Sequence, residues 1–192
     1  MTREVLLELF RTSGALLDGH FRLTSGLHSP GYLQCALVLQ HPPHAESLGR
    51  AIAGRTRDLT PTVVLSPALG GVVIGHEVAR ALGVRAIFAE RQDGRLTLRR
   101  GFSVTGRDRV LVVEDVLTTG GSTRETMAVA TAAGALVVGA GSIVDRSGGR
   151  IGFEVPLHAL LDMALPTYEP ETCPLCAQGV PVVKPGSRTT AV

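Results

Sequence analysis

The sequence has no tryptophan, few aromatic residues and only three cysteines. Aromatic side chains make up 4% of the 192 residues, so no stacking platform for single-stranded nucleic acid is visible. Three cysteines do not make a disulfide framework, and a reducing cytoplasm is therefore the expected location. No apolar run approaches the roughly 18 residues that a membrane span needs. The N-terminal stretch MTREVLLELFRTSG has the pattern of an amphipathic helix and lacks the features of a signal peptide.

An excess of charge of one sign is also missing. The chain has 19 basic and 17 acidic residues, for a net charge of +2, which argues against nucleic acid as the main partner. Hydrophobic residues make up 44% of the sequence and charged residues 19%, as expected of a globular fold. The length favours one domain, residues 1–192.

Short apolar runs alternate with helical patterns, which predicts an α/β fold with a central parallel sheet flanked by helices. Residues 20–39 are predicted to form a hairpin or meander outside that sheet. Residues 90–106 form a polar connection that is too long for an ordinary loop, and a tail begins at residue 170. The predicted strands are 62–66, 86–89, 110–113 and 136–143, and the predicted helices are 46–59, 75–82 and 122–133.

Two acids follow the third of these apolar runs, in the stretch VLVVEDVLTTGGST. Ligands of open parallel sheets bind beyond the carboxyl ends of the strands, where Glu114 and Asp115 are expected. The turn after them has glycines and hydroxyls suited to a phosphate. It has neither the lysine of a P-loop nor the G-x-G-x-x-G of a dinucleotide site. The structural alternative is that the acids favour the helix dipole and that Ser122 or Thr123 caps the helix.

This stretch closely resembles the motif with which type I phosphoribosyltransferases bind phosphoribosyl diphosphate (PRPP). The resemblance implies that family's fold, with a small N-terminal hood at residues 1–40. It also implies that Glu114 and Asp115 hold the 2′- and 3′-hydroxyls of the ribose. The residues implied in binding the 5′-phosphate are Thr118, Thr119, Gly120, Gly121, Ser122 and Thr123.

Two further segments resemble parts of the same family. Ala68, Leu69, Gly70 and Gly71 resemble the pyrophosphate loop, which often carries a cis peptide; the alternative is an ordinary strand–turn–helix corner. Residues 90–106 resemble the mobile catalytic loop, often supplied by the neighbouring subunit. Gln92 stands at the first position where orotate enzymes of the family usually have a lysine. The expected functional arginines are Arg91, on the pyrophosphate, and Arg95, Arg99 and Arg100, which join Asp115 in catalysis.

The stretch GHFRLTSGLHSPGYLQC resembles the hood of orotate phosphoribosyltransferases, although Thr24 replaces the usual lysine. By this resemblance Phe21, Ser25, Thr118 and Arg146 contact orotate, and Arg146 pairs with its carboxylate. The alternative for Arg146 is a surface ion pair.

The implied reaction transfers ribose 5-phosphate from PRPP to orotate, giving orotidine 5′-monophosphate and pyrophosphate in pyrimidine biosynthesis. Mg²⁺ carried by PRPP is the implied cofactor, and a homodimer that shares residues 90–106 across subunits is the implied assembly. Two alternatives stay open. One is a transferase for a purine or another base, and the other is a PRPP-sensing regulator without turnover.

Cys173 and Cys176 form a C-x-x-C pair, which is half of a zinc site. No second pair follows, and the six histidines show no ligand spacing. We therefore expect a structural or subunit-contact role for the pair and no metal bound directly by the protein.

Overall fold

The computed structural model describes residues 1–23 and 25–184; Thr24 and the end of the tail, residues 185–192, lie outside the described part. The chain divides into two compact units. The first contains residues 39–163 together with Met1, and the second contains residues 2–38 with the described residues from 164 onward. Among the described helices, none is both long enough and apolar enough to cross a membrane.

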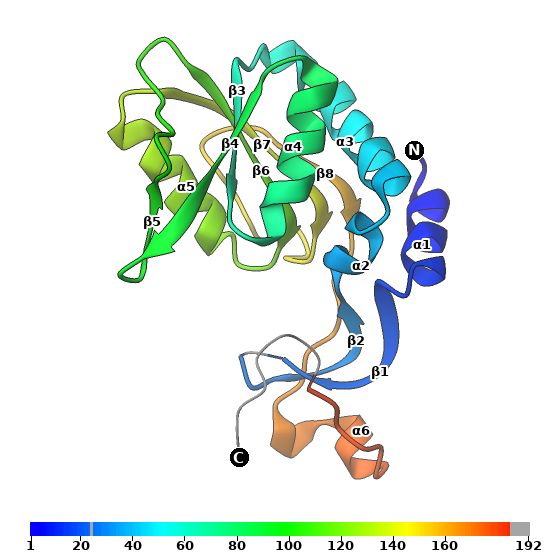
Figure 1. Ribbon diagram of the computed structural model, residues 1–192. Helices are drawn as coiled ribbons and strands as arrows, with labels where there is room; N and C mark the ends of the chain where they lie inside the picture. Colours follow the sequence, from blue (N-terminus) through cyan, green and yellow to red (C-terminus); the bar gives the residue numbers. More distant parts are fainter. Residues whose placement is uncertain (24, 185–192) are drawn as a thin grey trace. The chain divides into compact units, whose positions relative to one another are not determined.

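A six-stranded sheet forms the centre of the first unit (Figure 1), in the order β5-β4-β3-β6-β7-β8. All neighbouring strands are parallel except β4 and β5. The prediction of a central parallel sheet is therefore confirmed. The strands are β3 (Val63–Pro67), β4 (Arg85–Gln92), β5 (Arg95–Leu98), β6 (Arg109–Leu117), β7 (Leu136–Asp145) and β8 (Leu157–Asp162).

Helices cover both faces of this sheet, as the near-continuous apolar strands require. The helices α3 (Pro42–Thr56) and α4 (Gly70–Leu82) lie on one face, and α5 (Gly121–Ala132) lies on the other (Figure 1). A short 3-10 helix, η1 (Arg57–Leu59), follows α3. Residues 110–113 at the centre of β6 are fully buried. The apolar core therefore holds the start of β6 rigidly and leaves its polar carboxyl end at the edge of the sheet.

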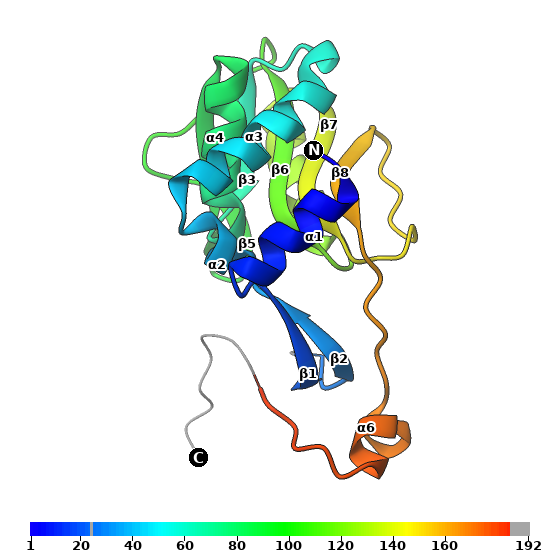
Figure 2. The ribbon, with the colours of Figure 1, turned by 90° about the vertical axis from the view of Figure 1, so that its right-hand side faces the viewer.

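The second unit is built around the hairpin of β1 (Leu16–Arg22) and β2 (His28–Leu33), which confirms the predicted hairpin (Figure 2). The helix α1 (Arg3–Thr12) confirms the predicted N-terminal helix and packs on β1. A short helix, α2 (Cys35–Leu39), follows the hairpin. The C-terminal segment contains η2 (Pro170–Thr172) and α6 (Pro174–Ala177). It joins the hairpin through bridges from Tyr168 to His28 and from Val183 to Phe21.

Two features of the sheet were not predicted from the sequence. Residues 90–98, interpreted as part of a long polar connection, belong to a β-hairpin of β4 and β5 with Asp93 and Gly94 at its turn. Both turn residues have positive φ, 50° and 82°, and Asp-Gly is a sequence that favours such turns. The strand β8 was not predicted, although its sequence LHALLD is mostly apolar.

Candidate functional site

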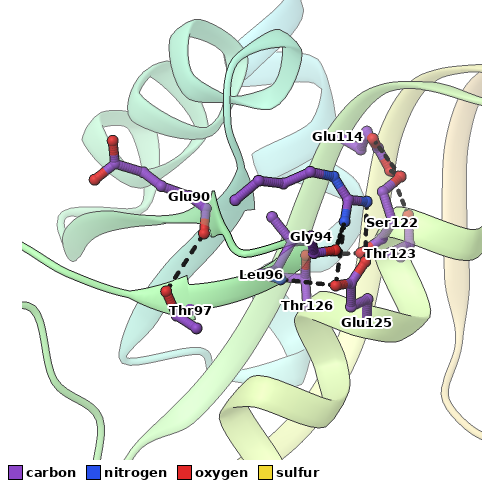
Figure 3. A network of polar contacts seen from close by, with 10 residues as sticks. Glu90, Gly94, Leu96, Thr97, Glu114, Ser122, Thr123, Glu125 and Thr126 are labelled. Carbon is purple, nitrogen blue, oxygen red and sulfur yellow. Dashed lines mark hydrogen bonds and ion pairs between the residues drawn. The ribbon is translucent and has the colours of Figure 1, made fainter.

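The carboxylate of Glu114 accepts hydrogen bonds from two hydroxyls of the segment that follows it. Ser122 donates its hydroxyl to Glu114 Oε1 at 2.8 Å, and the hydroxyl of Thr123 donates to Oε2. Figure 3 shows both hydroxyls, at the start of α5, directed at Glu114 at the end of β6. The turn thus supplies the hydrogen-bond donors that a half-buried carboxylate needs.

Asp115 lies against the loop that follows β3. A Cβ atom placed on Gly70 would lie 2.7 Å from Asp115 Oδ1, so only glycine allows this approach. Gly71 is equally constrained, because its Cβ would lie 2.9 Å from the carbonyl oxygen of Val113. Gly70 therefore lies beside Asp115, and Ser122 and Thr123 of the distant turn contact the neighbouring Glu114.

Burial raises the pKa of both acids above the ordinary carboxyl range. The hydroxyls of Thr123 and Ser122 lower the pKa of Glu114, whereas the neighbouring charge of Asp115 raises it. The backbone N–H of Val116, which donates to Asp115 Oδ1 at 2.9 Å, lowers the pKa of Asp115. Both carboxylates are consequently held where additional hydrogen-bond donors or a cation would stabilise their charged form.

The turn that leads into α5 presents an exposed face. Thr118, Thr119 and Gly121 are exposed, and Gly120 adopts φ 74° at the helix N-cap, where no side chain caps the helix. Arg124 stabilises the turn, because its guanidinium donates a hydrogen bond to the carbonyl of Thr119 at 3.0 Å. The first N–H groups of a helix have no acceptor within the helix, and such groups can bind an anion.

The loop after β3 contains a cis peptide bond between Ala68 and Leu69, a feature expected from the family resemblance. The N–H of Ala68 donates to the carbonyl of Ala89 on β4 at 2.8 Å, and the side chain of Leu69 is 87% exposed. The helix α4 begins at Gly70. Leu69 and Gly70 are thus exposed and Gly71 is buried, and Gly70 lies beside Asp115.

The arginines of the β4–β5 region have different surroundings. Arg91 donates to Glu125 Oε2 on α5 at 3.0 Å and to the carbonyl of Gly94 at 2.7 Å. Glu125 also accepts the N–H of Leu96 at 2.7 Å, so this single acid ties the hairpin to α5 (Figure 3). Hydrogen bonding by that N–H lowers the pKa of Glu125.

Arg100 adopts φ 56° and pairs with Glu90 through two hydrogen bonds of 2.7 and 2.9 Å. Its guanidinium also lies 6.0 Å from the ring centre of Phe88. Arg95 and Arg99 are exposed. Of the expected loop arginines, Arg91 and Arg100 are thus held by acids of this chain, and the other two face solvent.

Arg146 follows β7 at the same edge of the sheet as the acids. Its N–H donates to the carbonyl of Leu117 at 2.8 Å, which brings its backbone beside Thr118. Asp145 is buried and accepts the N–H of Ser147 at 2.7 Å. The expected site residues that follow β3 and β7 therefore lie at the same edge of the sheet as the acids of β6.

The other two expected orotate contacts belong to the second unit. Phe21 is 6% exposed, and its ring centre lies 5.8 Å from that of Tyr32. Ser25 is exposed in the turn between β1 and β2.

Sequence reasoning missed two residues that support this site, Arg124 and Glu125. Both lie in the first turns of α5, in the stretch directly after the recognised motif. Their signal is weak, because a charged residue at the start of a helix is common for reasons unrelated to ligands. Their partners, Thr119 and the β4–β5 hairpin, become visible only in the folded chain.

Comparisons with known proteins agree with this geometry. A family model described as "Phosphoribosyl transferase domain" matches residues 36–151. The orotate phosphoribosyltransferase of Pelotomaculum thermopropionicum is 55% identical over 188 residues, which cover 98% of this chain and 99% of that protein. The protein of the same name from Heliobacterium modesticaldum is 54% identical over 191 residues, which cover 98% of this chain and 100% of that one.

Among solved structures, the orotate phosphoribosyltransferase of Mycobacterium tuberculosis H37Rv in complex with inorganic phosphate is similar to this chain. The TM-score is 0.69 at 27% sequence identity, and the match covers 83% of this chain and 95% of that one.

Proposed function

This chain belongs to the phosphoribosyltransferase family, and we infer that it transfers ribose 5-phosphate from PRPP to orotate. The products are orotidine 5′-monophosphate and pyrophosphate, in the pathway to UMP. The observation that carries the choice of orotate is the similarity to proteins of that activity along almost the whole chain, at 54–55% identity. The enzyme is thus a pentosyltransferase of pyrimidine biosynthesis.

In the proposed site Glu114 and Asp115 accept hydrogen bonds from the 2′- and 3′-hydroxyls of the ribose. Residues 118–123, the turn before α5 and the first residues of that helix, bind the 5′-phosphate. Support comes from the hydroxyls of Ser122 and Thr123, which already orient Glu114. Asp115 also stabilises the positive charge that develops on the sugar ring as pyrophosphate leaves.

Pyrophosphate is proposed to bind at Ala68, Leu69, Gly70, Gly71 and Arg91. The close approach of Gly70 to Asp115 supports this arrangement, because it sets the backbone of the loop beside the ribose acids. Arg95, Arg99 and Arg100 offset the negative charge of the leaving group. We propose that these arginines act across the interface of a homodimer.

The proposed cofactor is Mg²⁺ bound to PRPP. The ion would be carried by the phosphate and ribose oxygens of PRPP, which magnesium prefers, and Glu114 and Asp115 would hold those ribose hydroxyls. When bound, the ion neutralises charge on the pyrophosphate group. The protein's own task is to align the orotate nitrogen with the anomeric carbon and to exclude water from that contact. The proposed location is the cytoplasm, where free thiols stay reduced.

Orotate is proposed to bind at Thr118 and Arg146, together with Phe21 and Ser25 of the hood. A guanidinium donates two parallel hydrogen bonds to a planar carboxylate, which orotate has and the other natural bases lack. The backbone contact of Arg146 with Leu117 supports the pairing of Arg146 with Thr118.

The test follows the loss of orotate absorbance with PRPP and Mg²⁺, with adenine, guanine, hypoxanthine and uracil in separate reactions. Turnover of orotate alone is the expected result. Turnover of another base would overturn the assignment of orotate and keep the sugar-phosphate site. PRPP binding without turnover of any base would identify a sensor.

A further inference from the structure

Four potential metal ligands lie close together in the second unit. In the sequence they are distant from Glu114 and Asp115. They are His20 on β1, His28 on β2, and Cys173 and Cys176 in the C-terminal segment. One ligand atom from each lies within 4.8 Å of all the others. His20, His28 and Cys173 are buried at 2%, 6% and 2% exposure, and Cys176 is exposed.

Three nitrogen–sulfur separations in the cluster match those around a tetrahedral ion, whereas the two histidine nitrogens lie closer together and would move apart when an ion binds. Nitrogen and sulfur ligands around one zinc ion lie roughly 3.3 to 3.8 Å from one another, given their bond lengths to the metal. His20 Nε2 lies 3.5 Å from the sulfur of Cys173 and 3.7 Å from that of Cys176. His28 Nδ1 lies 3.3 Å from the sulfur of Cys176 and 2.9 Å from His20 Nε2.

The hydrogen bond of His20 leaves its Nε2 free to bind a metal ion. Its Nδ1 lies 2.7 Å from the carbonyl oxygen of Val180. Because a carbonyl only accepts, Nδ1 carries the proton and Nε2 has a lone pair directed at the other three ligands. Orientation of a ligating histidine by a backbone carbonyl is the usual support of a metal site.

The backbone at each ligand is also suited to a site. The register of β1 against β2 shifts between Asp18 and Phe21, and this irregularity allows the consecutive residues His20 and Phe21 both to be buried. Cys173 is the N-cap of α6, and Cys176 lies in its single turn. Gly179, with φ 70°, then reverses the chain so that Val180 reaches His20.

Backbone pairing surrounds the four ligands. The N–H of Val183 donates to the carbonyl of His20 at 2.8 Å, and the N–H of His28 donates to the carbonyl of Tyr168 at 2.8 Å. These contacts fix the C-terminal segment on both sides of the C-x-x-C turn. Two buried imidazoles and two thiols are thus brought together by backbone contacts, and a ligand atom of each lies within 4.8 Å of the others.

We propose that His20, His28, Cys173 and Cys176 bind one Zn²⁺ ion as a structural site that clamps the C-terminal segment onto the β1–β2 hairpin. This proposal replaces the sequence-based expectation that the protein binds no metal directly. Four protein ligands leave no open position, so the ion has a structural role. Binding displaces one proton from each thiol, and the resulting Cys₂His₂ site is neutral. The exposed Cys176 gives the ion its route of entry.

The site adds stability where the apolar core is small. The second unit consists of α1, the hairpin, the short helix α2 and the C-terminal segment, and units this small often depend on metals or disulfides. A zinc ion would hold the hairpin that carries Phe21 and Ser25, whereas the residues proposed to bind PRPP all belong to the first unit. Its loss therefore leaves the ligands of the first unit intact.

The first experiment measures the zinc content of the full-length protein, purified under reducing conditions without a histidine tag. We expect about one zinc ion per chain. In the double variant Cys173→Ser/Cys176→Ser the zinc content should fall to background. Matched controls are Cys35→Ala, which removes the one cysteine outside the cluster, and His41→Ala, which removes an exposed histidine; both should retain the metal.

A second measurement covers the case in which the double variant does not fold. The wild-type protein is stripped with a chelator under reducing conditions and titrated with Co²⁺, which should give the visible bands of a tetrahedral thiolate site at one equivalent. Binding of PRPP to the stripped protein reports on the first unit separately. Three results would overturn the proposal: no zinc together with no Co²⁺ uptake, a Cys173–Cys176 disulfide in place of a metal, or zinc retained by a folded double variant.

Discussion

The carboxylate site of the first unit and the His–Cys cluster of the second are assembled in opposite ways. Glu114, Asp115 and the hydroxyls that meet them lie within ten consecutive residues, at the end of β6 and the start of α5. His20 and Cys173 are 153 positions apart. A strand followed directly by a helix forms its site locally, so its sequence is recognisable. When a site joins two distant segments, each segment contains only some of its ligands, so neither segment is recognisable as a site by itself.

The largest expected effect tests the local site. Asp115→Asn should reduce kcat by about a thousandfold, because the negative charge beside the developing sugar cation is lost while the side chain keeps its shape. Steady-state kinetics with orotate and PRPP would measure it. Asp58→Asn, an exposed acid in η1, is the control and should keep full activity. Unchanged turnover in Asp115→Asn would remove this acid from the site.

The next prediction concerns hydrogen exchange, which should respond to removal of zinc in the second unit and not in the first. Removal of zinc should speed hydrogen exchange roughly a hundredfold at the amides of Arg22 and His28, because the clamped segment then opens more often. Both amides donate to the C-terminal segment, to Val183 and Tyr168 respectively. Amides of β6 should keep their protection. Equally faster exchange in both units would contradict a role of zinc that is confined to the second unit.

Arg146→Ala should lower kcat/KM for orotate by about 10- to 100-fold, because a charge-assisted pair with the carboxylate is lost. The KM for PRPP should change little. Arg150→Ala is the matched control, since Arg150 lies on the same loop and donates to the carbonyl of Ser147 at 2.8 Å. A transferase for a base without a carboxylate would be insensitive to the change at Arg146.

Glu125 offers a smaller test, of the tie between the β4–β5 hairpin and α5. Glu125→Ala should lower the free energy of unfolding by about 1 kcal/mol, because the N–H of Leu96 and the guanidinium of Arg91 lose their acceptor. Glu125→Gln keeps an acceptor for Leu96 and should lose less. Chemical denaturation of both variants would measure the difference, and equal losses would mean that only the charge matters.

The smallest effect concerns pH. Burial raises the pKa of Asp115, so the folded state binds its proton more tightly than the unfolded state does. Ionisation of Asp115 therefore lowers stability as the pH rises from the ordinary carboxyl pKa of about 4 to the raised value. Asp115→Asn removes this cost. Its Tm should exceed that of the wild type at neutral pH, and the gain should vanish in acid; a lower Tm at pH 7 would contradict the cause given for the shift.

Much of the first unit was predictable, because its signals are local. The apolar runs at Val63, Ala86, Val110 and Leu136 indicated four of the central strands, and the acids after Val113 indicated the candidate site. The hairpin at 90–98 was not recognised, since its strands are polar and charged on an edge of the sheet. The strand β8 was missed because its apolar run is short and lies between loops. Such edge strands depend on the neighbours that they pair with.

The sequence by itself determined the fold class, the resemblance to a PRPP-binding motif and the position of the two acids near the end of β6, because each of these depends on residues that are neighbours along the chain. Tertiary structure alone decided which glycine faces Asp115, which acid holds Arg91, and which histidines meet the C-x-x-C turn. The physical reason is the same in each case. These contacts join segments separated by tens of residues or more, and only the packing of the folded chain selects one partner among the many of the same chemical type.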